Sequence, residues 1–173
     1  MKELPAQLPK WSSDFKLGDY CESWDDKPSE PGVYLVLSGR PINRAGGRDP
    51  SGILYVGQAL ILRNRLWDLR DANQHHLAGD FLSGNPDVAR LVLQTELTSS
   101  EQVKTALGNL WARVASPLPR NLLTESERAV IWAYIIRYGE PPPLNSALPQ
   151  RWDERPKEKW LKWARTGIAV GIS

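Results

Sequence analysis

The fold is decided by two short apolar runs, Val33-Tyr34-Leu35-Val36-Leu37 and Ile53-Leu54-Tyr55-Val56. Pro31-Gly32 precedes the first run, and Gly57 ends the second. Short runs that are rich in β-branched and aromatic residues and bounded by turn residues are typical of strands. The two strands most simply pair as an antiparallel hairpin, with residues 38–52 as an enlarged connection.

Two helices follow from the change in apolar spacing. Residues 60–70 place three leucines on one stripe, namely Leu62, Leu66 and Leu69. Residues 124–138 form the strongest expected helix, because residues 129–136 are all apolar and Gly139 with the prolines behind it stops the helix. A helix that is apolar all round is expected to be buried.

The remaining elements have weaker patterns. We expect a short helix at 76–82, a third strand at 90–97, and a helix that starts at Ser99 or Ser100 and ends before Pro117. Its apolar face consists of Val103, Leu107, Leu110 and Val114. A last helix is expected from Pro156 to about Thr166. This order predicts an α/β (α+β) fold with a small, three-stranded, mostly antiparallel sheet flanked by helices.

The composition is that of one globular domain. The chain has 173 residues, of which 41% are hydrophobic, and we expect a core at 31–146, an N-terminal lead-in at 1–30 and a C-terminal Trp- and Lys-rich helix at 147–173. A net charge of +2 does not by itself indicate a nucleic-acid partner. A single cysteine excludes an internal disulfide framework and a zinc site built on cysteines. With no segment of signal-peptide or membrane-spanning character, the chain is expected to be cytoplasmic, with no membrane partner.

Five sequence features occur in a characteristic order. Gly32-Val33-Tyr34 starts the first strand, and Tyr55-Val56-Gly57 ends the second. Arg65 follows eight residues after Gly57, Glu127 lies near the start of the long helix, and Asn145 follows the proline turn. In this order the features resemble the GIY-YIG nuclease family, including the nuclease domain of the bacterial excision-repair incision protein and some restriction endonucleases. The resemblance covers residues 31 to 146.

The resemblance implies metal-dependent hydrolysis of a phosphodiester bond in nucleic acid, with DNA favoured over RNA. It implies catalytic roles for Tyr34, Tyr55, Arg65 and Glu127. Glu127 would be the one protein carboxylate on a Mg²⁺ (or Mn²⁺) ion. Either tyrosine could activate the attacking water; we favour Tyr34, with Tyr55 orienting the water or the phosphate. Contact with the substrate is expected from Gly57, Gln58, Arg63 and Asn145.

The helical spacing predicts the surroundings of Arg65 independently of the family resemblance. Leu62, Leu66 and Leu69 surround Arg65 on the apolar side, whereas Arg63 and Arg70 are expected to face solvent. A buried guanidinium needs a partner, because an unpaired buried charge is very costly. That partner is either a carboxylate in a structural ion pair or a phosphate, which the planar guanidinium binds through two hydrogen bonds.

Glu127 and Asn145 both have structural alternatives. Thr124-Glu125-Ser126-Glu127 matches a capping box, in which Glu127 would bond to the amide of Thr124. Asn145 lies eighteen residues beyond Glu127, a longer gap than in the family. Aligning the family's Glu with Trp132 or Ala133 instead would imply an inactive enzyme. Asn145 could be no more than a turn residue.

Some features depart from the family or have two interpretations. Gln58 stands where the excision-repair relatives have Lys, so the alternative function is a catalytically inactive nucleic-acid-binding module. Leu69 stands where some restriction enzymes have His, and His75 and His76 are more typical of a surface loop. Two basic segments could contact DNA or simply be solvated or docked: the loop with Arg40, Arg44 and Arg48, and the C-terminal stretch from Arg151 to Arg165.

Overall fold

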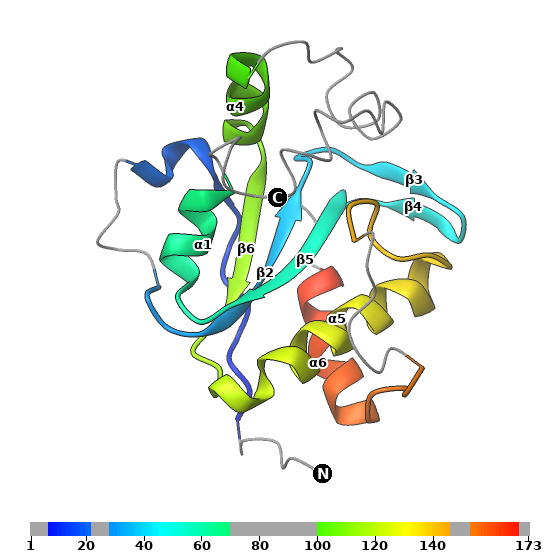
Figure 1. Ribbon diagram of the computed structural model, residues 1–173. Coiled ribbons are helices and arrows are strands. Elements are labelled where there is room, and N and C mark those ends of the chain that lie inside the picture. Colours follow the sequence, from blue (N-terminus) through cyan, green and yellow to red (C-terminus); the bar gives the residue numbers. More distant parts are fainter. Residues whose placement is uncertain (1–6, 22–27, 70–99, 146–152, 170–173) are drawn as a thin grey trace.

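The computed structural model describes residues 7–21, 28–69, 100–145 and 153–169 (Figure 1). One sheet has four strands, in the order β1-β6-β2-β5, and every neighbouring pair is antiparallel. Its strands are β1 (Phe15–Lys16), β2 (Gly32–Leu37), β5 (Ile53–Ala59) and β6 (Trp111–Ala115). The expectation of a mixed fold with a mostly antiparallel sheet is confirmed, but the sheet has four strands rather than three.

Helices cover both faces of this sheet (Figure 1). Helices α1 (Leu62–Asp68) and α4 (Ser100–Gly108) pack on the face that carries Tyr34 and Val36. Helices α5 (Leu123–Tyr138) and α6 (Glu158–Ala169) pack on the opposite face. The described residues also contain two 3-10 turns, η1 (Gly18–Cys21) and η3 (Arg120–Leu122). None of the helices seen in these ranges has the length and apolar character to cross a membrane.

The predicted hairpin is confirmed, because β2 and β5 pair along their whole length. Tyr34 lies opposite Gly57, and Val36 lies opposite Tyr55. Alternate residues of a strand point to the same face, so Tyr34 and Tyr55 are diagonal neighbours on one face of the sheet. The register therefore brings the two predicted motifs together.

The prediction for residues 109–115 is wrong. They were expected to continue a helix, but α4 ends at Gly108 and β6 begins at Trp111, in the middle of the sheet. Leu107, Leu110 and Val114 do share one core cluster, as a helical spacing suggested. Leu107 reaches it from α4, Leu110 from the irregular connection and Val114 from β6. The strand expected at 90–97, the helix expected at 76–82, and Arg70, His75 and His76 lie outside the described residues.

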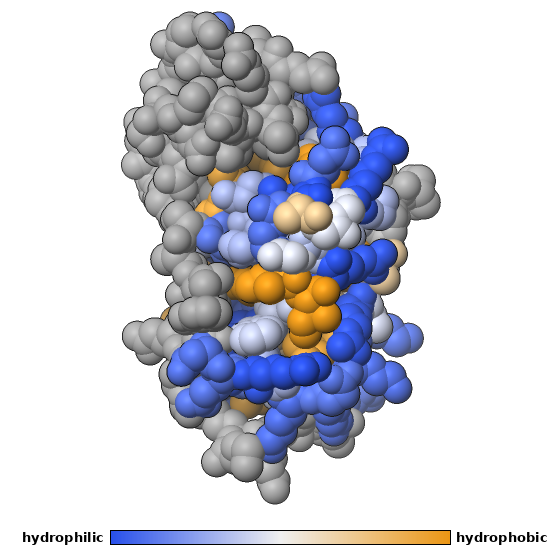
Figure 2. Space-filling view, turned by 90° about the vertical axis from the view of Figure 1, so that its right-hand side faces the viewer, coloured by the Kyte–Doolittle hydropathy of each residue, from blue (hydrophilic) through white to orange (hydrophobic). Residues whose placement is uncertain are grey.

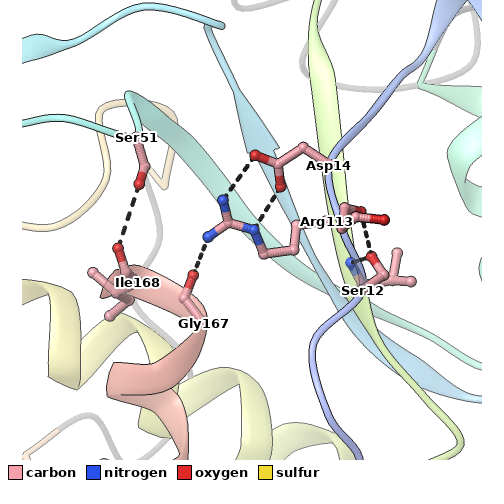
Figure 3. Close-up of polar contacts among 8 residues, drawn as sticks. Ser12, Asp14, Ser51, Arg113, Gly167 and Ile168 are labelled. Carbon is pink, nitrogen blue, oxygen red and sulfur yellow. Dashed lines mark hydrogen bonds and ion pairs between the residues drawn. The ribbon is translucent and has the colours of Figure 1, made fainter. Parts of the chain in front are cut away.

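The N-terminal segment is not merely an irregular lead-in, because β1 forms the edge of the sheet next to β6. A buried ion pair joins the two strands: Arg113 Nε and Nη2 donate to Asp14 Oδ1 at 2.6 Å and Oδ2 at 2.8 Å (Figure 3). Arg113 is 0% exposed and also donates to the carbonyl oxygen of Gly167 in α6. Arg113 thus connects the N-terminal segment, the central sheet and the last helix.

The expected basic loop at 38–52 contains a second, two-stranded sheet formed by β3 (Ile42–Arg44) and β4 (Gly47–Asp49). Arg44 pairs with Glu140 at 3.1 Å and donates to the carbonyl oxygen of Pro141 at 2.7 Å. The hairpin is therefore docked on the C-terminal end of α5, and Arg44 is not free to follow a DNA backbone. Arg40 and Arg48 are exposed.

Helix α5 is confirmed as a mostly buried helix, and Gly139 ends it in the left-handed conformation. Ile136 is an exception, with 46% of its surface exposed.

Figure 2 views the side on which α5 and the β3–β4 hairpin lie in Figure 1, and an apolar band crosses it between hydrophilic areas.

Helix α6 begins at Glu158, two residues after Pro156, and ends beyond the expected Thr166. Trp160 and Trp163 are buried, and the Trp163 ring stacks on Trp11 with 5.2 Å between ring centroids. These two C-terminal tryptophans are therefore part of the core, and stacking on nucleic acid is excluded for them.

Candidate active site

Gly57 is the point at which the two tyrosines meet. The rings of Tyr34 and Tyr55 lie 6.0 Å apart, centroid to centroid, at an interplanar angle of 40°. A Cβ atom at Gly57 would lie 2.5 Å from Tyr34 Cζ and 2.7 Å from Tyr55 Cε1, and would also collide with the Tyr34 hydroxyl. Any other residue at this position would therefore push the rings away. The role of Gly57 seen here is to admit the two phenols.

The phenol of Tyr34 lies within electrostatic reach of the other predicted catalytic residues. Its pKa is raised well above the ordinary value, first by burial and then by Tyr55, including a side-chain hydrogen bond between the two. The guanidinium of Arg65 lowers the pKa, and the carboxylate of Glu127 raises it. The fold thus brings together residues from β2, β5, α1 and α5. Tyr34 keeps its proton at neutral pH in this environment, because burial outweighs the positive charge of Arg65.

Glu127 lies in the second turn of α5 and faces the end of β5. Its Oε2 accepts a hydrogen bond of 3.1 Å from Gln58 Nε2, which also donates to Thr124 Oγ1 at 3.3 Å. Burial raises the pKa of Glu127 to about 7, and the bond from Gln58 acts in the opposite direction. The capping-box alternative is wrong, because α5 begins at Leu123, before Thr124, and its N-cap Leu122 receives no side-chain bond.

Arg65 lies on α1 at the wall of a cleft of about 460 Å³. Within the described part of the chain, no carboxylate lies at ion-pair distance from Arg65, so the ion-pair alternative finds no partner there. Arg63 does not line this cleft and is half-buried rather than facing solvent as expected. Arg65 is half-buried as well, so the two arginines differ in their access to the cleft and not in their burial.

Asn145 binds the backbone of the edge strand β5. Its Oδ1 accepts from the Val56 amide at 2.9 Å, and its Nδ2 donates to the Val56 carbonyl oxygen at 2.8 Å. The neighbouring Leu144 amide donates to the Leu54 carbonyl oxygen at 2.9 Å. Both ends of the Asn145 amide are thus engaged by the strand that carries Tyr55, which favours a positioning role over direct contact with substrate.

The cleft reveals residues that the sequence patterns did not single out. It is lined by residues from the end of β5, from α1, from η3 and from the start of α5: Gln58, Ala59, Leu60, Ile61, Asn64, Arg65, Asp68, Arg120 and Leu123. Arg120 follows Pro119 immediately before the long helix. In the sequence, Arg120 is marked only by its position, as a basic residue shortly before the helix that carries Glu127.

The acidic side chains of the described residues are dispersed, apart from those near the candidate site. Among the residues that the structure describes, no group of three or more His, Cys, Asp and Glu side chains gathers in one place. Glu127 is a largely buried carboxylate whose charge is disfavoured by desolvation, and a cation would offset that cost. A site with one carboxylate suits Mg²⁺, which keeps several waters and takes its other oxygens from substrate phosphate.

Comparison of the chain with protein-family models, with curated proteins and with solved structures found no match.

Proposed function

We propose that this protein is a metal-dependent endonuclease of GIY-YIG type that cuts DNA. The observation that carries the proposal is the convergence of a second phenol, one guanidinium and one carboxylate on Tyr34, whose pKa all three influence. These four groups come from separate elements, and they stand in the order that resembles the family. A guanidinium without a carboxylate partner in the described residues suits a phosphate ligand.

Each residue has a role that its surroundings support. Arg65, on the cleft wall, binds the scissile phosphate and stabilises the negative charge that develops on its oxygens. Glu127 holds the divalent ion. Tyr34 and Tyr55 position the attacking water beside the phosphate. Added positive charge would lower the pKa of Tyr34 so that the phenol releases its own proton to solvent, and the resulting phenolate would then accept a proton from the water. Gly57 and Asn145 keep the two rings and the edge strand in place.

Bound at Glu127, Mg²⁺ would add positive charge that lowers the pKa of Tyr34 and stabilises the phosphoryl oxygens in the transition state. One carboxylate and one ion provide less stabilisation than a two-metal site. A larger share therefore falls to Arg65.

The alternative function is a catalytically inactive nucleic-acid-binding module with the same fold. Two observations favour it: Gln58 already occupies one oxygen of Glu127, and Tyr34 is firmly protonated. Both functions predict binding that weakens steeply with salt, since phosphate contacts release counterions. They differ only in cleavage.

The deciding experiment incubates the purified chain with supercoiled plasmid and with labelled single-stranded DNA and RNA, in Mg²⁺, Mn²⁺ or EDTA. We expect nicks in DNA that require the divalent ion. Salt-sensitive binding without cleavage of any of these substrates would establish the inactive module. Failure to bind any of them would reject both functions.

A further inference from the structure

The cleft beside Arg65 combines charge with exposed apolar surface. Leu60 and Ile61 form the turn between β5 and α1, and they are 54% and 45% exposed. Both line the cleft, and Leu123 provides a third apolar side chain. Single exposed apolar residues are common on protein surfaces and mean little. Two consecutive ones at the mouth of a candidate active site are a potential contact surface for an apolar part of the substrate.

The charged groups of the cleft limit what that substrate can be. Arg65 and Arg120 contribute two positive charges, and Asp68 contributes one negative charge. The lining residues therefore carry a net charge of +1, which matches one phosphodiester rather than a run of phosphates. Asp68 would repel a second phosphate, but a carboxylate accepts hydrogen bonds from the amino group of a base. Asn64 adds an amide that can donate and accept.

The volume of the cleft also favours a single nucleotide as its ligand. About 460 Å³ lies within the range of about 300 to 1,000 Å³ that is typical of small-ligand sites. Apolar side chains that contact bases commonly insert between base steps and unstack them. A base inside a duplex is stacked on both faces and paired along its edge, so it cannot enter such a cleft. An unpaired base can do so at little energetic cost.

We propose that the cleft is a subsite for one unstacked nucleotide next to the scissile phosphate. The base packs against Leu60, Ile61 and Leu123, and its phosphate lies between Arg65 and Arg120. The preferred substrate is therefore DNA with an unpaired nucleotide at the cleavage position, such as a bulge, a mismatch or a single-stranded junction. This inference rests on the proposed function for the position of the scissile phosphate, whereas the preference for an unpaired nucleotide requires only that the site binds DNA.

The test compares two oligonucleotide duplexes that are identical except for one extrahelical nucleotide. Binding is measured by fluorescence anisotropy in EDTA, and single-turnover cleavage is measured in Mg²⁺. Ile61→Ser is the test variant. Ile136→Ser is its matched control, because Ile136 is 46% exposed, lies on α5 and does not line the cleft. For each variant, the affinity and the cleavage rate on the bulged duplex are divided by those on the fully paired duplex. These ratios do not depend on the fraction of the protein that is folded.

We expect the parent and Ile136→Ser to prefer the bulged duplex on the order of tenfold or more, and Ile61→Ser to bring the ratio close to one. Cleavage of both duplexes at equal rates would overturn the inference while leaving the proposed function intact. A tenfold binding preference without cleavage would support the inference and reject cleavage. A preference that Ile61→Ser leaves unchanged would also overturn the inference, as would no binding to either duplex.

Discussion

Gln58 Nε2 donates a hydrogen bond of 3.1 Å to Glu127 Oε2, which joins the end of β5 to the second turn of α5. Burial raises the pKa of Glu127 to about 7, and this bond limits the rise because it stabilises the charged carboxylate. The protonation of Glu127 is therefore balanced near neutral pH, and a single neighbouring side chain can shift it.

Substitution of Gln58 should move that balance in either direction. Gln58→Met removes the donor and should raise the pKa of Glu127. Gln58→Lys places a positive charge beside the carboxylate and should lower it. The measurement is a ¹³C NMR titration of the glutamate carboxyl groups. The midpoint of the acidic limb in the pH–rate profile for cleavage should also be highest in Gln58→Met and lowest in Gln58→Lys. An unchanged Glu127 titration in both variants would contradict the contact.

Glu127→Gln should abolish divalent-dependent cleavage, with a loss on the order of a hundredfold or more, because the amide carries no charge to hold the ion. Glu101→Gln is the control, since Glu101 is exposed on α4 and does not line the cleft. Single-turnover rates of both variants are compared with the parent. Cleavage by Glu127→Gln at the parent's rate would show that the ion is held elsewhere.

Glu127→Gln should also change how stability depends on pH. The carboxyl has a pKa of about 7 when folded against 4.5 as its ordinary value, so the folded chain binds this proton more tightly than the unfolded chain does. The contribution of Glu127 is therefore fully present below pH 4.5 and is lost as the pH rises through 7. At 1.36 kcal/mol per pKa unit, the loss is on the order of 3 kcal/mol.

The parent should thus lose stability relative to Glu127→Gln between pH 5 and pH 8, as measured by urea unfolding without divalent ions. Mg²⁺ at pH 8 should restore stability to the parent and not to the variant, because it binds only the ionised carboxylate. A pH-independent difference between the two proteins would show that Glu127 is solvated like an ordinary glutamate.

Arg65→Lys should reduce cleavage far more than Arg63→Lys. Lys keeps the charge but loses the planar pair of donors that holds a phosphate. Loss of a transition-state contact of this kind costs on the order of a hundredfold. Arg63→Lys is the control, because Arg63 does not line the cleft whereas Arg65 does. Rates are measured under single turnover at matched ionic strength, with thermal melts alongside. Equal rates in the two variants would make Arg65 a bystander.

Gly57→Ala should inactivate the protein through displacement of the tyrosines. A methyl group there would lie 2.5 Å from Tyr34 Cζ, so the ring has to move. Gly108→Ala is the control, because its new methyl group would meet only Gly18 Cα, at an ordinary 3.8 Å. Near-ultraviolet circular dichroism reports the tyrosine environment, and cleavage reports the site. An unchanged spectrum with full activity would show that the rings do not depend on Gly57.

The parts of the fold that could be predicted are those specified by short stretches of sequence. β2, β5 and α5 have apolar runs bounded by glycine and proline, and the pairing of β2 with β5 needs only a local turn. β6 could not be predicted this way. Its residues 111–115 continue the helical spacing of α4, and its place in the sheet depends on backbone pairing with β2 and β1, which are distant in sequence.

The same distinction holds for the candidate site. Motif order and helical period predicted that Tyr34, Tyr55 and Arg65 lie near one another. The contact between Gln58 and Glu127 joins positions 69 residues apart, and no local pattern indicates it. Arg120, Leu60 and Ile61 were missed because their relevance comes from the shape of the cleft. The two hydrogen bonds between the Asn145 side chain and the Val56 backbone were also missed. They form only because residues distant in sequence return to the edge strand β5.

Arg113 has a consequence for the order in which the molecule can assemble during synthesis. The side chain lies in the middle of the sheet, yet one of its acceptors, the carbonyl oxygen of Gly167, is made more than fifty residues later. Until that helix leaves the ribosome, the central strand keeps an unsatisfied donor, and the face that Trp160 and Trp163 will cover remains open to water. The four strands can therefore pair before α6 has been made, but until then one face of the sheet stays apolar and exposed, as in a folding intermediate.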